Sequence, residues 1–258
     1  AMYESKSAGR NTLRFFDPAM QALVADRTAL ESDLRQGLKR NELVVYYQPV
    51  VNMHSHVVGA EALVRWKHPA HGLVPPNRFI PMAEQTGLIL PLGEFVLETA
   101  CKQLALWSMH SSTAGLTIAV NVSARQFKHP DFVQHVMALL KKTNAQAHLL
   151  KLELTESMLL GDTLEAVTKM ADLRKLGVTF SLDDFGTGYS SLSYLKRIPV
   201  QTLKIDQSFV RDVLTDPNDA AIARTVVALG TSLGLRVIAE GVETQAQREF
   251  LERNDCHA

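Results

Sequence analysis

The chain has 258 residues, 46% hydrophobic and 21% charged, a composition typical of one large or two small globular domains and unlike that of disordered or fibrous proteins. Its 27 basic and 27 acidic side chains cancel, which argues against a protein that grips a long nucleic acid but allows a small phosphate-bearing ligand. The two cysteines form no CxxC pair, and the sequence contains neither a run of about 18 apolar residues nor a signal pattern, so we expect a cytoplasmic protein. Any inner-membrane anchor of a parent protein would lie in segments outside this sequence.

The predicted elements begin after an aperiodic stretch, residues 1–16. A helix is predicted next, from the cap and first-turn proline of Asp17-Pro18 to Arg40. Seven apolar, β-branched runs then predict strands over residues 43–50, 57–66, 116–123, 150–155, 178–185, 202–209 and 235–241. Amphipathic segments between them predict helices over residues 88–109, 131–142, 163–176, 190–197, 219–233 and 244–253.

Strands that alternate with helices indicate an α/β fold with a parallel sheet, and about 250 residues is the usual size of a (β/α)₈ barrel. The first connection differs, because only residues 52–56 separate the first two strands and a parallel crossover needs about a dozen residues or more. We therefore expect an antiparallel first pair. A closed barrel needs an eighth strand after residues 244–253, so either the barrel is open or its last strand is missing from this sequence.

Polar side chains recur at the C-terminal end of every predicted strand after the first. They are Glu61, Arg65, Asn121, Glu153, Glu156, Asp183, Asp184, Lys204, Asp206, Glu240 and Glu243. In a barrel these ends form one rim, where catalytic groups are found. Any one of these residues could be polar simply because a strand surfaces there, but so many carboxylates on one rim would repel one another unless cations bind among them.

Carboxylates and one amide, with no Cys or His in the ring, are hard oxygen donors suited to Mg²⁺, Mn²⁺ or Ca²⁺, and we favour magnesium or manganese. Adjacent Asp183 and Asp184 would point to opposite faces of a regular strand, so both serve one site only where the strand ends. Two ions about 3.5–4 Å apart are a known device for phosphoryl chemistry. A carboxylate shared by two ions would suit that arrangement.

Two cations of the ring have two interpretations each. Arg65 shares a strand face with Glu61 and could fork onto a phosphate or form a rim ion pair. Lys204 could orient or deprotonate an attacking water, or only compensate the acidic charge. The histidine pairs His54/His56 and His68/His71 are better explained as solvated loop residues than as metal ligands.

Taken together, these residues resemble the EAL domain of cyclic di-GMP phosphodiesterases. The resemblance runs from about Leu43 to the end and rests on YYQPVV around Gln48, EALVRW at 61–66, NVSARQF at 121–127, ELTES at 153–157, DDFGTGYSSL at 183–192, KIDQSFV at 204–210 and AEGVET at 239–244. So many spaced motifs make chance agreement negligible.

The resemblance implies a modified TIM barrel with an antiparallel first strand, and hydrolysis of cyclic di-GMP to linear pGpG with two Mg²⁺ or Mn²⁺ ions, Ca²⁺ being inhibitory. By the same resemblance, the metal ligands are Glu61, Asn121, Glu153, Asp183, Asp184 and Glu240. Lys204 matches the residue that holds the attacking water, Asp206 and Glu243 match supporting acids near the substrate, and Glu156 matches a glutamate that tethers the glycine-containing loop. The substrate-contacting positions are Gln48, Leu63, Arg65 and Gln126.

The resemblance also predicts the organisation of the chain. Residues 1–16 resemble the end of a GGDEF cyclase domain, residues 17–41 would be a linker helix, and residues 42–258 the EAL domain, without the last strand of the family. Family dimers form through the loop and helix after the paired aspartates, here the region 185–200. There are two alternatives. One is an EAL-like receptor that binds the dinucleotide without cleaving it, and the other is an unrelated metal-dependent barrel. The retained ligands and Lys204 favour the enzyme, and fold alone explains none of the motifs.

Overall fold

A computed structural model describes residues 18–159, 163–186 and 195–258, with side chains from residue 26 onward. The chain divides into two units. The first comprises residues 1–44 and 65–88, and the second residues 45–64 and 89–258. Among the residues described, no helix is long and apolar enough to cross a membrane.

The first unit contains α2 (Pro18–Lys39), β3 (Gly72–Val74) and α3 (Pro76–Thr86). Trp66, on the part of β2 that belongs to this unit, is fully buried, and its Nε1 donates to Glu42 Oε2 at 3.1 Å. The ring of Phe79 from α3 packs edge-on against it. Neither β3 nor α3 is expected from the sequence. The prolines at 75, 76 and 81 suggest a loop, but a proline in the first turn is compatible with a helix.

His68 also lies in this unit, and the expectation that it is a solvated loop residue is wrong. Its side chain is buried, and its Nε2 lies 3.3 Å from Asp33 Oδ2. Its Nδ1 accepts the backbone N–H groups of Ala70 and His71. Both ring nitrogens are therefore engaged in protein contacts, which leaves neither for a metal ion. His54 and His56, by contrast, are exposed as expected.

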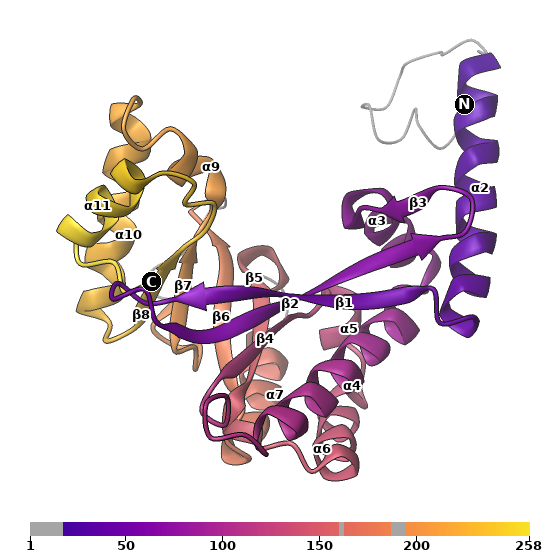
Figure 1. Ribbon diagram of the computed structural model, residues 1–258, viewed down its shortest axis with the longest axis horizontal. Coiled ribbons are helices and arrows are strands. Elements are labelled where there is room, and N and C mark those ends of the chain that lie inside the picture. Colours follow the sequence, from indigo (N-terminus) through magenta and orange to yellow (C-terminus); the bar gives the residue numbers. More distant parts are fainter. Residues whose placement is uncertain (1–17, 160–162, 187–194) are drawn as a thin grey trace. The chain divides into compact units, whose positions relative to one another are not determined.

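The second unit is built on a curled sheet with the order β1-β2-β4-β5-β6-β7-β8 (Figure 1). Its strands are β1 (Leu43–Val51), β2 (Val57–His68), β4 (Thr117–Asn121), β5 (Leu150–Thr155), β6 (Thr179–Phe185), β7 (Thr202–Ile205) and β8 (Arg236–Ala239). From β2 to β8 the pairs are parallel. The β1–β2 connection is a tight hairpin turn in which Asn52 N donates to His56 O, so the first strand is antiparallel as predicted.

Helices follow the strands and cover the outer face of the sheet. They are α4 (Ile89–Trp107), α5 (Ala124–Phe127), α6 (Phe132–Thr143), α7 (Thr163–Lys175), α9 (Gln207–Arg211), α10 (Pro217–Ser232) and α11 (Gln245–Arg253), with short 3₁₀ turns η1 (Ala147–Leu149) and η2 (Glu156–Leu159). The predicted helix over 190–197 falls mostly outside the described residues. The chain is thus an α/β protein whose sheet forms a modified TIM barrel. β8 is the seventh strand of the main order, and no further barrel strand follows it among the residues described.

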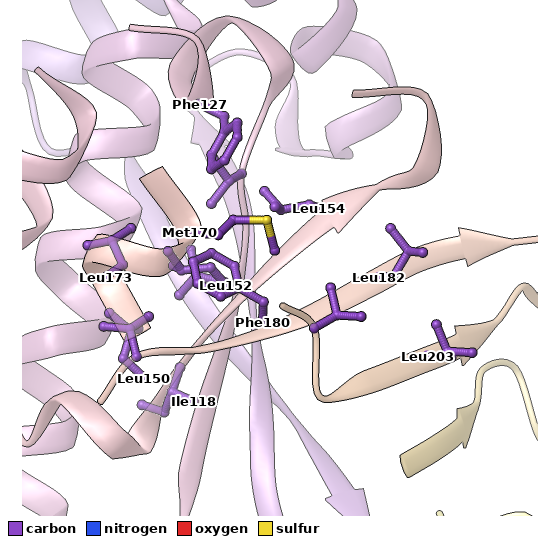
Figure 2. Close-up of a cluster of buried hydrophobic side chains, with 14 of the residues drawn as sticks. Ile118, Phe127, Leu150, Leu152, Leu154, Met170, Leu173, Phe180, Leu182 and Leu203 are labelled. Carbon is purple, nitrogen blue, oxygen red and sulfur yellow. The ribbon is translucent and has the colours of Figure 1, made fainter. Parts of the chain in front are cut away.

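The main core lies between the outward face of the sheet and these helices. Figure 2 shows Leu150, Leu152 and Leu154, alternate residues of β5, beside Met170 and Leu173 of α7. Because side chains alternate along a strand, the residues between these leucines face the inside of the barrel. Burial of the leucines therefore fixes the direction in which Glu153 points. The same alternation in β6 and β7 directs Asp183 and Lys204 inward, since Leu182 and Leu203 belong to the core.

Candidate active site

The predicted ring residues lie at or near the C-terminal ends of their strands, as the barrel argument requires. Asn121 is the last residue of β4, Lys204 lies one residue before the end of β7, and Glu240 directly follows β8. Glu61 lies earlier in β2, which continues as far as His68. Parallel register brings these ends together, since Asn121 pairs with Glu153 and Thr155 with Asp183.

Lys204 occupies the centre of the cluster, and four carboxylates surround its ammonium group. Nζ lies 2.7 Å from Glu153 Oε2, 3.3 Å from Asp183 Oδ1 and 3.4 Å from Glu61 Oε2, and it also contacts Glu240 Oε1. The side chains of Lys204 and Glu153 are 5% and 3% exposed. One buried positive charge therefore faces four acids, which leaves the cluster with an excess of acidic groups that further cations can balance.

Two more of the predicted ligands adjoin this cluster. Asn121 Nδ2 donates to Glu61 Oε1 at 2.6 Å, which leaves the amide oxygen of Asn121 as a further donor atom toward a cation. Asp184 neighbours Asp183, whose Oδ1 accepts the Asp184 backbone N–H at 3.0 Å. The sequence predicts that the strand ends at this pair, but β6 continues to Phe185. Instead the β6–β7 register shifts between Leu182 and Phe185, and Asp184 adopts a left-handed conformation with φ of 54°.

Burial and like charge perturb the protonation of this cluster. Burial raises the pKa of Glu153 to about 8 and that of Glu240 to about 7, although Lys204 opposes both shifts. Burial, together with the neighbouring Asp183 and Asp206, also raises the pKa of Asp184. Burial disfavours the charged form of Lys204, but Glu153, Asp183, Glu61 and Glu240 together hold its pKa above the ordinary value. Lys204 is therefore a permanent cation here, and groups with shifted pKa values of this kind cluster at functional sites.

The donor set fits a divalent cation by its chemistry. Carboxylate oxygens and one amide oxygen are hard ligands of the type that Mg²⁺ and Mn²⁺ take. Within the described part of the chain, no group of three or more His, Cys, Asp or Glu side chains has the geometry to hold a metal ion as it stands. The four carboxylates converge instead on the ammonium of Lys204, which occupies the centre of the cluster.

A cavity of about 450 Å³ opens beside the cluster. Glu61, Asp183, Lys204 and Glu240 supply its acidic and basic wall. The rest of its lining comes from Gln48, Pro49, Val50, Val51, Asn52, Met53, Leu63, Gln207, Ile238, Ala239, Gly241, Val242, Arg248, Leu251 and Ala258. Gln48 and Leu63, two of the predicted substrate contacts, are therefore at the cavity and within the same unit as the cluster.

The remaining predicted residues lie elsewhere. Gln126 is buried in α5 against Gly93 of α4, and Arg65 belongs to the first unit. Asp206 Oδ1 caps α9 by accepting Ser208 N at 2.9 Å. Glu243 is exposed at the start of the turn into α11. None of these four is part of the cavity lining, and their predicted roles stay predictions.

Glu156 is buried in η2, and among the described residues neither of its carboxylate oxygens has a hydrogen-bond partner. The loop that Glu156 is predicted to tether falls largely on residues 187–194, which lie outside the described part. Only parts of the predicted dimer region 185–200 are described, so that prediction also remains a prediction.

Gln207 and Arg248 are among the cavity-lining residues that sequence reasoning missed. Gln207 follows Asp206 within KIDQSFV, and its Cβ lies beneath Gly241, where φ is +68° and a side chain would collide with Gln207. Arg248 belongs to the polar helix α11, where an arginine is expected on the surface for solubility alone. The motif context could have suggested Gln207, whereas no local pattern marks Arg248.

Comparison with known proteins gives the family. The profile described as "EAL domain" matches residues 31–258. The bifunctional diguanylate cyclase/cyclic di-GMP phosphodiesterase MucR of Pseudomonas aeruginosa is 48% identical over an alignment of 260 residues that covers all of this chain and 38% of MucR. The cyclic di-GMP phosphodiesterase NbdA of the same species is 40% identical over 99% of this chain and 33% of its own length. The chain thus spans about a third of the length of these curated relatives.

A solved structure described as "PaMucR Phosphodiesterase, c-di-GMP complex" superposes with a TM-score of 0.86 at 48% identity, over 89% of this chain and 93% of that one. The match therefore extends over most of the chain rather than over one motif. The profile, the curated relatives and the fold agree, and the chain belongs to the EAL domain family.

Proposed function

We propose that this chain hydrolyses cyclic di-GMP to linear 5′-pGpG and so lowers the level of this second messenger. The observation that carries the proposal is the cluster of Lys204 and four carboxylates at the wall of a cavity of about 450 Å³. The names of the relatives MucR and NbdA, and the cyclic di-GMP complex of the similar structure, support this choice of substrate.

Phosphodiesterases of the EAL family depend on divalent metal ions. For this chain we propose two ions, Mg²⁺ or Mn²⁺, with Ca²⁺ inhibitory. The residues that would hold them are Glu61, Asn121, Glu153, Asp183, Asp184 and Glu240. Bound there, the ions would neutralise the phosphate charge and acidify the attacking water.

In the proposed reaction, the water oxygen forms a bond to one phosphorus, the bond from that phosphorus to a 3′ oxygen breaks, and the proton of the water passes to the leaving 3′ oxygen. The ring opens and a 5′ phosphate remains. Lys204 holds the attacking water, because its ammonium is fixed by Glu153 and its neighbours at the cavity wall. Such positioning lowers the barrier, because the water has already lost the translational and rotational entropy that it would otherwise lose on reaching the transition state.

The position of Gln48 on β1 and Leu63 on β2 in the cavity lining supports their proposed contacts with the dinucleotide. Arg65 and Gln126 are proposed as further substrate contacts, and Asp206 and Glu243 as supporting acids, from the family resemblance alone, because none of the four belongs to the lining. Glu156 would tether the loop after the paired aspartates. We further propose a homodimer through the region 185–200, a GGDEF domain upstream of residue 17 in the parent protein, and action in the cytoplasm.

The test is incubation of the purified protein with cyclic di-GMP and Mg²⁺ or Mn²⁺, followed by separation of the products. We expect linear pGpG as the product, and no product after chelation of the metal. The variant Glu61→Gln, which preserves size and removes charge, serves as the matched inactive control. Binding of cyclic di-GMP with no turnover in the unmodified protein would contradict the enzyme and indicate a receptor instead.

A further inference from the structure

Arg248 makes a set of contacts that the proposed chemistry does not use. From α11 its Nη1 donates to Ser55 Oγ at 2.8 Å and its Nη2 donates to the carbonyl oxygen of Met53. Its Nε donates to Glu252 Oε1 at 2.8 Å, one turn further along the helix. Glu252 therefore holds the guanidinium group by Nε, while Nη1 and Nη2 of Arg248 reach the turn between β1 and β2.

The turn that receives these bonds is well defined. Asn52 Oδ1 accepts the backbone N–H groups of His54 at 2.9 Å and His56 at 3.0 Å, and Ser55 N donates to Asn52 O at 2.9 Å. Ser55 has φ of 60°, a left-handed conformation that non-glycine residues rarely adopt. Such conformations persist where surrounding contacts stabilise them, and the Arg248 bonds to Ser55 and Met53 are contacts of this kind.

These bonds join the β1 end of the sheet to α11, the helix that follows β8 along the chain. β1 and β8 stand last in the hydrogen-bonded order, and within the described residues no strand lies between them. The cavity lining includes Gln48 of β1 and Met53 of the turn as well as Ile238 of β8 and Glu240, which follows it. In Figure 1 the arrowhead of β1 points toward the side on which β8 and α11 lie, in agreement with the contacts of Arg248 with Ser55 and Met53.

We propose that Arg248 is a positioning residue that fixes the β1–β2 turn to α11 and thereby sets the width of the cavity. Its role in substrate binding rests on the proposed function, whereas its role in ordering the turn does not. Arg248 does not act on the reacting atoms, because its donors face the turn and Glu252. It acts through β1 and β2, which carry the cavity-lining residues Gln48 and Glu61.

The first measurement is hydrogen exchange of the amides of residues 52–56 in the intact chain. The guanidinium bonds are charge-assisted, and the loss of one is expected to speed local opening by about tenfold or more. Arg248→Ala should show this acceleration, and Ser55→Ala, a milder change, should show part of it. Arg253→Ala is the matched control, because Arg253 lies on the same helix and its polar side-chain contacts among the described residues are with Glu249 of that helix. Unchanged exchange in Arg248→Ala would overturn the proposal.

The second measurement separates binding from chemistry. With cyclic di-GMP as substrate, Arg248→Ala should raise KM about tenfold while kcat changes less than about twofold, because the acid cluster keeps its own contacts. Arg253→Ala should alter neither constant. An equal fall in kcat for both variants would overturn the positioning role. If the unmodified chain shows no turnover, the proposed function fails, and the exchange comparison alone decides whether Arg248 fixes the turn.

Discussion

Lys204 and Glu153 form a buried ion pair inside the barrel, with 2.7 Å between Nζ and Oε2. The side chain of Lys204 is 5% exposed and that of Glu153 is 3% exposed. Glu153 comes from β5 and Lys204 from β7, so the pair spans the strand that carries Asp183. Both side chains point inward because their neighbours along the strands pack in the core shown in Figure 2.

Replacement of Lys204 by Ala should depress turnover far more than substrate affinity. Groups that position an attacking water or accept its proton typically contribute about 10²–10⁴-fold to the rate. The affinity for cyclic di-GMP, measured by calorimetry, should change much less, because Gln48 and Leu63 line the cavity independently of Lys204. If Lys204 only compensates charge, excess Mn²⁺ would restore full turnover. Such a rescue would exclude the catalytic role.

Replacement of Glu61 by Ala should abolish hydrolysis with little effect on folding. Its side chain is 19% exposed, and Lys204 keeps its contacts with Glu153, Asp183 and Glu240 after the change. We expect the free energy of unfolding in urea to change by less than about 1 kcal/mol. Glu153→Ala should cost about 2 kcal/mol or more, since it removes the most buried of the four acidic side chains that contact Lys204. Equal destabilisation by the two variants would contradict the prediction that Glu153 contributes more than Glu61 to folding stability.

The stability of the metal-free protein should depend on pH through the same cluster. Burial raises the pKa of Glu153 from 4.5 to about 8 in the folded protein. The folded state therefore binds a proton more tightly than the unfolded state, and the free energy of unfolding should fall as pH rises from about 4.5 to about 8, with a slope approaching about 1.4 kcal/mol per pH unit for a full proton. Urea unfolding in EDTA at several pH values measures this slope. Glu153→Gln should flatten it, and a difference of the opposite sign would refute the prediction.

Replacement of Gly93 by Ala should destabilise the second unit, because a Cβ at this position would collide with the side-chain amide of Gln126. Overpacking of this kind typically costs about 1–3 kcal/mol. Gly115→Ala is the matched control, since a Cβ there would meet nothing within 4 Å. Thermal unfolding of the two variants gives the comparison, and Gln126→Ala in the Gly93→Ala background should restore part of the loss. Similar melting temperatures for both single variants would show that Gln126 can move aside without cost.

The sequence allowed most of the fold to be predicted, for reasons that individual elements make clear. Long amphipathic segments such as α4 and buried strands such as β5 carry strong periodic signals, and the short connection at residues 52–56 requires an antiparallel hairpin. The segment of α3 carries a weaker signal, because Pro75, Pro76 and Pro81 suggest a loop unless the burial of Phe79 against Trp66 is known. That contact is tertiary and leaves no local trace.

The composition of the site could be predicted, but its geometry could not. Strand alternation placed Glu61, Glu153, Asp183 and Lys204 on one rim, whereas the convergence of four carboxylates on Lys204 depends on the register between strands. The register shift at Asp184 depends on the pairing of β6 with β7. The contact of Arg248 with Ser55 joins residues that are 193 positions apart in the sequence. Local sequence patterns contain no information about such pairings.

The contacts that complete the site also join the most distant parts of the chain. Glu61 and Lys204 are 143 residues apart, and Ser55 and Arg248 are 193 apart. Parallel pairs such as β5–β6, in contrast, join strands that follow one another along the chain. Closing long loops carries an entropic cost that slows the formation of distant contacts. During synthesis or refolding, the successive strand and helix units therefore form before the cavity closes, and recovery of catalytic activity should lag behind recovery of the far-ultraviolet circular dichroism signal.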